Sequence, residues 1–153
     1  MLKKSIFFFI LNILYAENRT VALDDLYQSN FKIKDKNFKV WLALNPKQQA
    51  EGLSCLDSDE IPFDCGMLFV YPFDALRKFW MRETNVNLDI AFIKKNGVVS
   101  DIFHMPKNSK EYFFSSEKVR YVLELREGIF DHIPLVVGDV IEIPKVVLDF
   151  SKS

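Results

Sequence analysis

The chain has 153 residues, which is enough for one domain with a sizeable hydrophobic core. Hydrophobic residues make up 49% of the sequence, with only 5 Gly and 6 Pro, which excludes a disordered or low-complexity chain. The formal net charge of −1 gives no electrostatic basis for nucleic-acid binding, so we do not expect nucleic acid as a partner.

The first sixteen residues have the pattern of a secretory signal peptide. Lys3 and Lys4 precede an apolar run from Ile6 to Leu14, which is too short to span a bilayer comfortably. We expect cleavage after Ala16 and an exported protein, in the periplasm or cell envelope. Loss of the two lysines leaves 18 basic and 21 acidic residues, a net charge of −3. An uncleaved segment would be the only membrane contact, and an N-terminal strand or helix of the domain is the remaining interpretation.

The predicted organisation is a signal-like segment, a linker and one domain, at residues 1–16, 17–30 and 31–150. Alternation of apolar and polar residues over Phe31–Leu44 predicts a hairpin whose lysines form a solvated face. Asn45 is a suitable N-cap and Pro46 a suitable first residue for a short helix, which Gly52 is expected to end.

Further strands are predicted along the rest of the domain. They lie at Met67–Tyr71, Phe79–Glu83, Leu88–Ile93, Val98–His104, Tyr121–Arg126 and Val140–Ile143. Turns are expected at Pro72–Asp74 and at Lys95–Gly97, and a turn or short helix at Gly128–Ile133. Many short strands and little helix predict a mostly β fold, all-β or α+β. Its expected form is a compact antiparallel sandwich or distorted barrel with one or two short helices.

Motifs over roughly two thirds of the chain, from about Pro46 to Ile143, are similar to those of a known family. They are Gly52-Leu53, Gly66-Met67-Leu68-Phe69, Phe79-Trp80-Met81, Thr84, Leu88-Asp89-Ile90, Ser115-Ser116, Tyr121-Val122-Leu123-Glu124-Leu125, Gly128 and Gly138-Asp139. Together they resemble the DUF192 (UPF0127) family, small domains of unknown function often found behind a signal peptide. The resemblance implies a compact, mostly β domain without an established biochemical role.

The chain departs from the family pattern at four positions. Gln49, Glu51 and Ser54 stand where the family usually has Arg, Arg and Met. Asn87 stands where the family usually has a proline before Leu-Asp. A role that depends on those arginines, such as anion binding, is therefore not carried over to this chain.

Four residues of the central strands form the candidate ligand pocket. Asp89 lies within an apolar strand, and burying an unpaired carboxylate is costly, so it needs a specific partner or a specific function. If the strand faces converge, Trp80, Thr84, Asp89 and Glu124 line one polar pocket with an aromatic floor. Alternatively, Asp89 satisfies backbone N–H groups, Trp80 belongs to the core and Glu124 pairs with a nearby arginine.

Cys55 and Cys65 bracket the loop LDSDEIPFD. In an exported chain they most simply form one disulfide, which would contribute about 2–3 kcal/mol through the unfolded state. Two reduced thiols are the alternative. His104 and His132 do not stand in ligand spacing with either cysteine, so we predict no metal site and no cofactor. Ser115-Ser116 lacks a nucleophile elbow, and no catalytic residue is predicted.

Three functions are compatible with these features. The first is an exported, non-catalytic module that binds an unknown small ligand or assists another envelope protein. The second is a glycan-directed hydrolase in which Asp89 and Glu124 act as a carboxylate pair, roughly 5–9.5 Å apart. The third is a structural partner of an envelope protein, through an exposed apolar patch. An exposed cluster that includes Phe73, Phe113, Phe114 or Phe130 would support it, and a uniformly polar surface would count against it. We favour the first function, and whether the protein is an enzyme stays open.

Overall fold

The computed structural model describes residues 19–152, so the predicted signal peptide lies outside the described residues. The helical elements are η1 (Leu23–Asp25, a 3-10 turn), α2 (Pro46–Glu51), α3 (Ile129–His132) and α4 (Lys145–Phe150). The strands are β1 (Gln28–Ile33), β2 (Lys36–Ala43), β3 (Cys65–Ala75), β4 (Lys78–Trp80), β5 (Leu88–Ile93), β6 (Val99–Met105), β7 (Tyr112–Phe114) and β8 (Val119–Arg126). None of the helices in this part of the chain has the length and apolar character needed to cross a bilayer.

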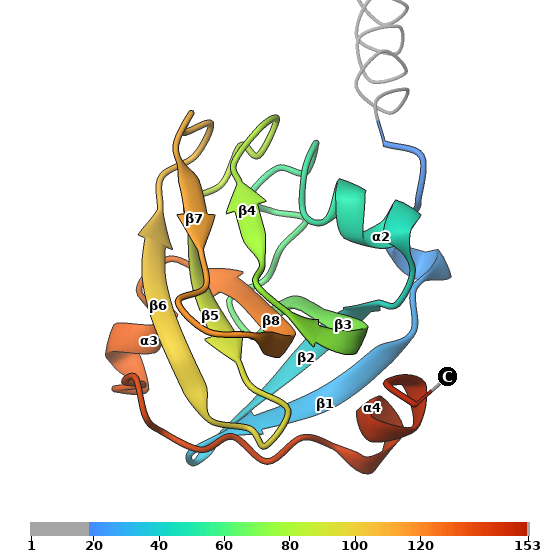
Figure 1. Cartoon of the computed structure of the whole chain (residues 1–153). Coiled ribbons are helices and arrows are strands. Elements are labelled where there is room, and N and C mark those ends of the chain that lie inside the picture. The colour runs from blue at the N-terminus through green and yellow to red at the C-terminus, as the bar shows by residue number, and fades with distance from the viewer. Residues whose placement is uncertain (1–18, 153) are drawn as a thin grey trace, which may run out of the picture.

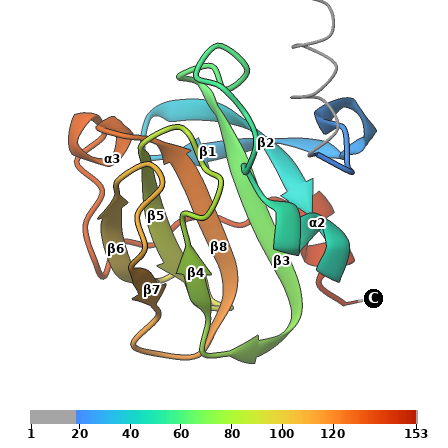
Figure 2. The same ribbon diagram turned by 90° about the horizontal axis from the view of Figure 1, so that it is seen from above.

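Two sheets form the fold. Six strands make one sheet in the order β1-β2-β3-β8-β5-β6, and β4 pairs with β7 in a separate two-stranded sheet. The small sheet lies over one face of the large one, and α2 and α3 lie at opposite ends of the molecule (Figures 1 and 2). The prediction of a mostly β, sandwich-like fold is confirmed. Over residues 19–152 the sheet does not close into a barrel, and the short α-helices number three.

One strand pair of the large sheet is parallel. β2 and β3 pair from Lys39↔Cys65 to Ala43↔Phe69 in the same direction, whereas the other pairs are antiparallel. A parallel pair requires the chain to cross back over the sheet between its strands, and here α2 and the loop at residues 52–64 make that crossing. This pair corrects the purely antiparallel expectation, because alternation within a strand carries no information about the direction of its neighbour.

Local sequence signals position the hairpin and the first helix. β1 and β2 pair antiparallel around a turn at Lys34, and the residues of β1 are alternately exposed and buried. The Asn45 side chain accepts a hydrogen bond from the Gln48 N–H at the start of α2 (3.0 Å), and Gly52 ends that helix at a φ of 51°. The predicted hairpin and helix are therefore confirmed.

The strands β3 and β4 end at residues other than those predicted. β3 continues through Pro72–Asp74, where a turn was expected, because a register irregularity between Val70 and Ala75 leaves proline outside the regular ladder. β4 stops at Trp80 instead of continuing to Glu83, which lies in a turn with a φ of 55°. Residues after Trp80 therefore do not follow the strand alternation that was expected along Phe79–Glu83.

The C-terminal part also differs from the prediction. Val140–Ile143 forms no strand and contributes only the isolated bridge Val98↔Val140. The helix α4 follows it and places Val147 in the core, although the sequence pattern predicted no helix there. The short strand β7 was likewise not predicted, because three residues are too few to establish an alternation.

A hydrophobic cluster packs on each face of the large sheet. On one face, Phe130 from α3 and Val147 from α4 cover the inner residues of the strands. On the other face, Met81 after β4 and Phe113 from β7 do so. Different elements pack on the two clusters: α3 and α4 on the first, and β7 with the residues after β4 on the second. The face of the sheet to which a side chain points therefore decides which of these elements it contacts. The candidate pocket lies on the second face.

The structured chain begins before residue 31. β1 starts at Gln28, and the Arg19 guanidinium donates hydrogen bonds to the carbonyl oxygens of Gly52 and Ser54, both at 2.9 Å. Burial lowers the pKa of Arg19 despite the nearby carboxylate of Glu51. The segment from Arg19 onward, predicted as part of a linker, is thus bound to the domain.

Candidate functional site

A cavity of about 360 Å³ lies between α2, the turn after β4 and the face formed by β3 and β8. The residues that line it are Gln49, Ala50, Glu51, Gly52, Leu53, Ser54, Phe69, Tyr71, Lys78, Phe79, Trp80, Arg82, Glu83, Thr84 and Glu124. Three of the four predicted pocket residues, Trp80, Thr84 and Glu124, are therefore brought together. Asp89 does not line this cavity.

Glu124 is the buried carboxyl group of the cavity. Its residue is only 4% exposed, and its neighbours across the sheet are the apolar residues Met67 on β3 and Ile90 on β5. Among residues 19–152 no hydrogen bond or ion pair reaches its carboxyl group. Burial raises the pKa of Glu124 from 4.5 to about 8. The carboxyl group therefore borders the cavity from an otherwise apolar setting, where a polar group of a bound molecule could reach it.

Three uncharged polar side chains of the cavity, on Gln49, Ser54 and Thr84, have backbone partners. Gln49 Nε2 donates to the Val70 carbonyl oxygen at 2.9 Å. Ser54 Oγ donates to the Glu51 carbonyl oxygen at 2.6 Å, and Thr84 Oγ1 donates to a carbonyl oxygen two residues earlier at 3.2 Å. Both hydroxyls are thus used in local turns rather than directed at a base, and neither has the arrangement of an activated nucleophile.

Charged side chains surround the mouth of the cavity. The Glu51 carboxylate is held by the backbone N–H of Val21 (2.8 Å) and by the N–H of the preceding residue. Arg82 Nε lies 3.9 Å from Glu83 Oε1, beyond hydrogen-bond distance, and both side chains are largely exposed. Lys78 Nζ lies 4.0 Å from the centre of the Tyr112 ring. The two cations of the mouth therefore make no hydrogen bond to a carboxylate within the described chain.

Two consecutive aromatic residues of β4 point in opposite directions. Phe79 faces inward and packs edge-on against Phe69, with ring centres 4.8 Å apart. Trp80 faces outward, is 47% exposed, and lies nearly parallel to Tyr112 on β7, with ring centres 5.9 Å apart. Trp80 is therefore an exposed aromatic wall of the cavity and not a core residue.

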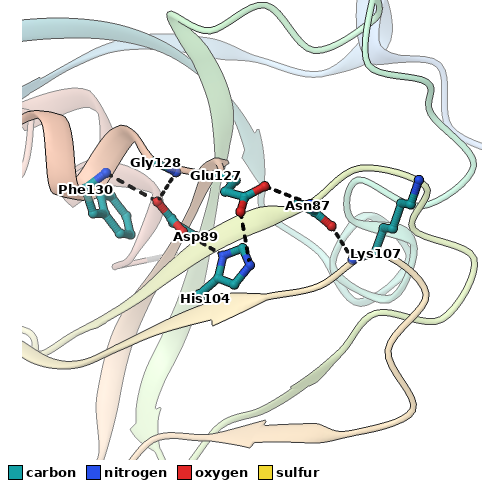
Figure 3. Close-up of polar contacts among 7 residues, drawn as sticks. All are labelled: Asn87, Asp89, His104, Lys107, Glu127, Gly128 and Phe130. Atoms are coloured by element: carbon teal, nitrogen blue, oxygen red, sulfur yellow. Dashed lines mark hydrogen bonds and ion pairs between the residues drawn. The ribbon is translucent and has the colours of Figure 1, made fainter.

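Asp89 lies outside the cavity, on β5 opposite His104 of β6, in a network of polar contacts (Figure 3). Its Oδ2 accepts hydrogen bonds from the N–H groups of Gly128 (2.8 Å) and Phe130 (3.4 Å), and its Oδ1 contacts His104 Nδ1 at 3.3 Å. His104 Nε2 also lies 3.3 Å from Glu127 Oε1. Burial raises the pKa of Asp89 even though these hydrogen bonds act in the opposite direction. Asp89 thus joins the start of α3 to β6.

The strand register separates the two carboxylates that were predicted to act as a pair. Asp89 is opposite Leu125, whose side chain belongs to the cluster under α3 and α4, whereas Glu124 is opposite Ile90 in the other cluster. Directly paired residues point to the same face of a sheet. Asp89 and Glu124 therefore lie on opposite faces. The expected convergence of Asp89 with the pocket is wrong, and the two groups do not flank a common cleft.

Cys55 and Cys65 are both half-buried. Cys65 Sγ lies 3.6 Å from Asp64 Oδ1, and burial together with that carboxylate raises the pKa of the Cys65 thiol. The Cys55–Cys65 disulfide stays a prediction. Within residues 19–152, no three His, Cys, Asp or Glu side chains are grouped so as to hold a metal ion.

The exposed aromatic patch has other members than expected. Phe113 and Phe130 are buried, in different clusters, while Phe73 and Phe114 are exposed. Two of the four candidate phenylalanines, Phe73 and Phe114, are therefore available at the surface. The outer face of the β4–β7 sheet instead presents Trp80, Tyr112 and Phe114, which are 46–55% exposed. The alternation of Tyr112 and Phe114 around the inward Phe113 was the signal for this face.

Several cavity residues were not singled out as site residues from the sequence. Gln49, Glu51 and Ser54, which differ from the family pattern, all line the cavity. Lys78 and Arg82 also belong to it. The spacing of these residues in the sequence did not mark them as site residues. They are brought to the cavity by the crossing between β2 and β3, by β4 and by the turn after it. Asn87, the fourth departure, instead donates to Glu127 and accepts from the Lys107 N–H in the network of Figure 3.

Comparisons with known proteins place this geometry in context. The sequence model of the DUF192 family, described as "Uncharacterized ACR", matches residues 29–143. A crystal structure from Sinorhizobium meliloti 1021, described as a candidate transcription regulator, is 28% identical, with a TM-score of 0.70 over 76% of this chain and 94% of that one. A structure of unknown function from Novosphingobium aromaticivorans DSM 12444 is 23% identical, with a TM-score of 0.66 over 77% of this chain and 85% of that one. No curated protein matches the chain.

Proposed function

The chain belongs to the DUF192 family, and we propose that it is an exported, non-catalytic module that binds a small ligand in the cavity between α2, β4 and β8. One observation carries this proposal. Glu124 is a nearly buried carboxyl that lines the cavity and makes no hydrogen bond within the described chain, and a titratable group with a strongly shifted pKa in a cavity is a candidate ligand contact. A ligand in the cavity supplies the missing partner.

The cavity favours binding over catalysis. The hydroxyls of Ser54 and Thr84 donate to backbone carbonyl oxygens. Of the other carboxylates that line the cavity, Glu51 is held by backbone N–H groups and Glu83 is largely exposed beside Arg82. A glycan hydrolase needs two carboxyl groups across one cleft. Since Asp89 lies on the other face of the sheet, the proposed role of this site is ligand binding.

Export is proposed from the N-terminal sequence pattern. The expected cleavage after Ala16 would leave Arg19 close to the new N-terminus. The contacts of Arg19 and Val21 with the loop after α2 and with Glu51 would then fasten the first mature residues beside the cavity. Nucleic acid is not proposed as a partner, because the net charge of −1 offers no attraction to phosphates, whatever the description of the Sinorhizobium relative.

A second candidate function is docking to another envelope protein. The observation that favours it is the exposed aromatic face of the β4–β7 sheet, made of Trp80, Tyr112 and Phe114. Aromatic side chains are enriched at protein interfaces. Trp80 belongs to both the cavity and this face, whereas Phe114 belongs to the face alone, so variants of these two residues distinguish the two functions.

The test is native mass spectrometry of the full-length gene product, expressed for export in a bacterial host and purified gently. We expect the mass of residues 17–153, and an additional mass that leaves on denaturation. A further loss of two hydrogens would establish the Cys55–Cys65 disulfide. Trp80→Ala should lose the additional mass while Phe114→Ala retains it.

Other results would overturn the proposal. A folded wild-type chain that carries no ligand and captures none from an extract of envelope metabolites contradicts ligand binding. Equal loss of the bound mass in the Trp80 and Phe114 variants would move the binding site to the aromatic face. An uncleaved chain that is retained in the cytoplasm contradicts export.

A further inference from the structure

The chemistry of the cavity identifies a class of ligand, and this step rests on the ligand-binding function proposed above. The Glu124 carboxyl is surrounded on its own sheet by Met67, Ile90 and Val122, none of which offers a polar atom in its side chain that donates a hydrogen bond. From β3, the nearby titratable group is Tyr71, whose pKa burial raises to about 12. The Arg77 guanidinium covers the Tyr71 ring at 3.6 Å, and among residues 19–152 no cation contributes to the pKa shift of Glu124.

In its ionised form the Glu124 carboxylate accepts hydrogen bonds only, so a partner that stabilises this form must be a donor. A hydroxyl group, as on a sugar, donates a hydrogen bond but leaves the buried charge uncompensated. An ammonium group supplies both donors and the opposite charge, and such charge-assisted hydrogen bonds are roughly twice as strong as neutral ones. The floor of the cavity therefore suits an ammonium group better than a hydroxyl group.

The mouth of the cavity has the opposite polarity. Lys78 and Arg82 lie on β4 and the turn after it, and within residues 19–152 neither donates a hydrogen bond to a carboxylate. The carboxylates near them are Glu51, already held by backbone N–H groups, and the exposed Glu83. Both cations are therefore available to a negative group on a ligand, as Arg and Lys often are.

The size and walls of the cavity restrict the ligand further. A volume of about 360 Å³ is at the lower end of the range for ligand pockets, which suits a compact molecule rather than an oligosaccharide. Phe69, Phe79 and Trp80 supply apolar walls. We propose that the cavity binds a free amino acid with an apolar side chain, its ammonium group at Glu124 and its carboxylate group toward Lys78 and Arg82.

The test compares three probes that share one side chain. L-leucine carries both charges, N-acetyl-L-leucine lacks the ammonium group, and 3-methylbutylamine lacks the carboxylate. Binding to the mature protein is measured by calorimetry and by the amide NMR shifts of the residues that line the cavity. We expect N-acetyl-leucine to bind at least tenfold more weakly than leucine, and the amine severalfold more weakly.

Matched variants assign the two charges. Glu124→Gln should weaken leucine binding at least tenfold and remove the preference over N-acetyl-leucine. Arg82→Gln and Lys78→Gln should each lower the affinity for leucine toward the weaker affinity for 3-methylbutylamine. Glu142→Gln and Lys47→Gln, at exposed positions outside the cavity, are the controls. Equal binding of leucine and N-acetyl-leucine would overturn the proposal.

The pH dependence separates an ammonium partner from the alternative in which neutral Glu124 donates a hydrogen bond. An ammonium ion requires the ionised carboxylate, so leucine affinity should rise about tenfold per pH unit below 8 while the amine stays protonated. The other charged groups that line the cavity are Glu51, Lys78, Arg82 and Glu83, and the Glu124→Gln variant retains all four of them. An affinity that falls as pH rises would overturn the ammonium assignment.

The two proposals fail in different ways. If neutral compounds such as glucose shift the cavity amide signals and the leucine series does not, the amino-acid assignment is overturned and ligand binding stands. If a ligand that co-purifies with the wild type is retained unchanged by both Trp80→Ala and Glu124→Gln, the cavity is not the binding site and both proposals fail.

Discussion

Asp89 and Glu124 lie on the adjacent strands β5 and β8, one residue apart in register, and their carboxyl groups face opposite sides of the sheet. Asp89 is satisfied by two backbone N–H groups and a histidine, whereas Glu124 has no hydrogen bond within the described chain. The two buried carboxyls therefore have different roles. Asp89 holds the fold together, and Glu124 is the candidate binding group. The predictions that follow test this division.

Glu124→Gln should stabilise the protein at neutral and alkaline pH. The folded pKa of about 8 is above the ordinary value of 4.5, so the unfolded chain loses this proton first as pH rises. The stabilising effect of the shift is complete below pH 4.5 and is lost as pH rises to about 8. Each unit of pKa difference corresponds to about 1.4 kcal/mol, so the variant should gain a few kcal/mol over the wild type at pH 8.

Denaturant unfolding at pH 4.5, 6 and 8 measures this difference, with the exposed Glu142→Gln as the control. The difference in the free energy of unfolding between Glu124→Gln and the wild type should grow with pH, and Glu142→Gln should show no such difference. A Glu124→Gln variant that is less stable than the wild type at pH 8 would show that the ionised carboxylate has a partner within the folded protein.

Asp89→Ala should lower the free energy of unfolding by about 1–3 kcal/mol, because it leaves the N–H groups of Gly128 and Phe130 without their acceptor. Hydrogen exchange at these two amides should accelerate, and ligand binding by the folded variant should persist. His104→Ala is the control. Its ring is half exposed and its contacts are 3.3 Å long, so it should cost less than about 1 kcal/mol.

Gly66→Ala should destabilise the sheet by about 1–3 kcal/mol or more. An added Cβ would lie 2.3 Å from the Glu124 carbonyl oxygen and 2.4 Å from Leu125 Cδ2, so β3 and β8 must separate. The change should also weaken ligand binding, since it displaces the strand that carries Glu124. Gly128→Ala is the comparison, because no atom lies within 4 Å of its added Cβ and only the backbone strain at φ 85° remains. Urea unfolding that ranks Gly128→Ala as the more costly change would contradict this prediction.

Arg19→Ala should loosen one wall of the cavity. The guanidinium holds the carbonyl oxygens of Gly52 and Ser54, so its loss should cost about 1–2 kcal/mol and weaken ligand binding severalfold. Lys47→Ala, at an exposed position of α2, is the control and should change neither quantity. The measurements are thermal unfolding and calorimetric titration. Unchanged binding in the Arg19 variant would mean that the segment before β1 does not shape the cavity.

The sequence by itself determined those elements whose signals are local. Alternation specified the β1–β2 hairpin, since a half-buried strand repeats every two residues. A short apolar run specified β5, which is buried at every position. Asn45, Pro46 and Gly52 specified α2, because capping needs only neighbouring atoms. The family resemblance was also readable from the motifs alone, and the match over residues 29–143 confirms it. Trp80, Thr84 and Glu124 could be chosen as candidates because polar and aromatic residues stood among apolar strands.

Only the tertiary structure decided which of these candidate residues line the same cavity. Alternation shows that Asp89 and Glu124 each differ from their sequence neighbours, but the pairing of Asp89 with Leu125 is what directs the two carboxyls to opposite faces. The parallel β2–β3 pair brings Gln49 and Glu51 to the cavity, although nothing in their spacing marks them. Register and strand order depend on contacts between residues far apart in the chain, and a one-dimensional pattern does not contain those contacts.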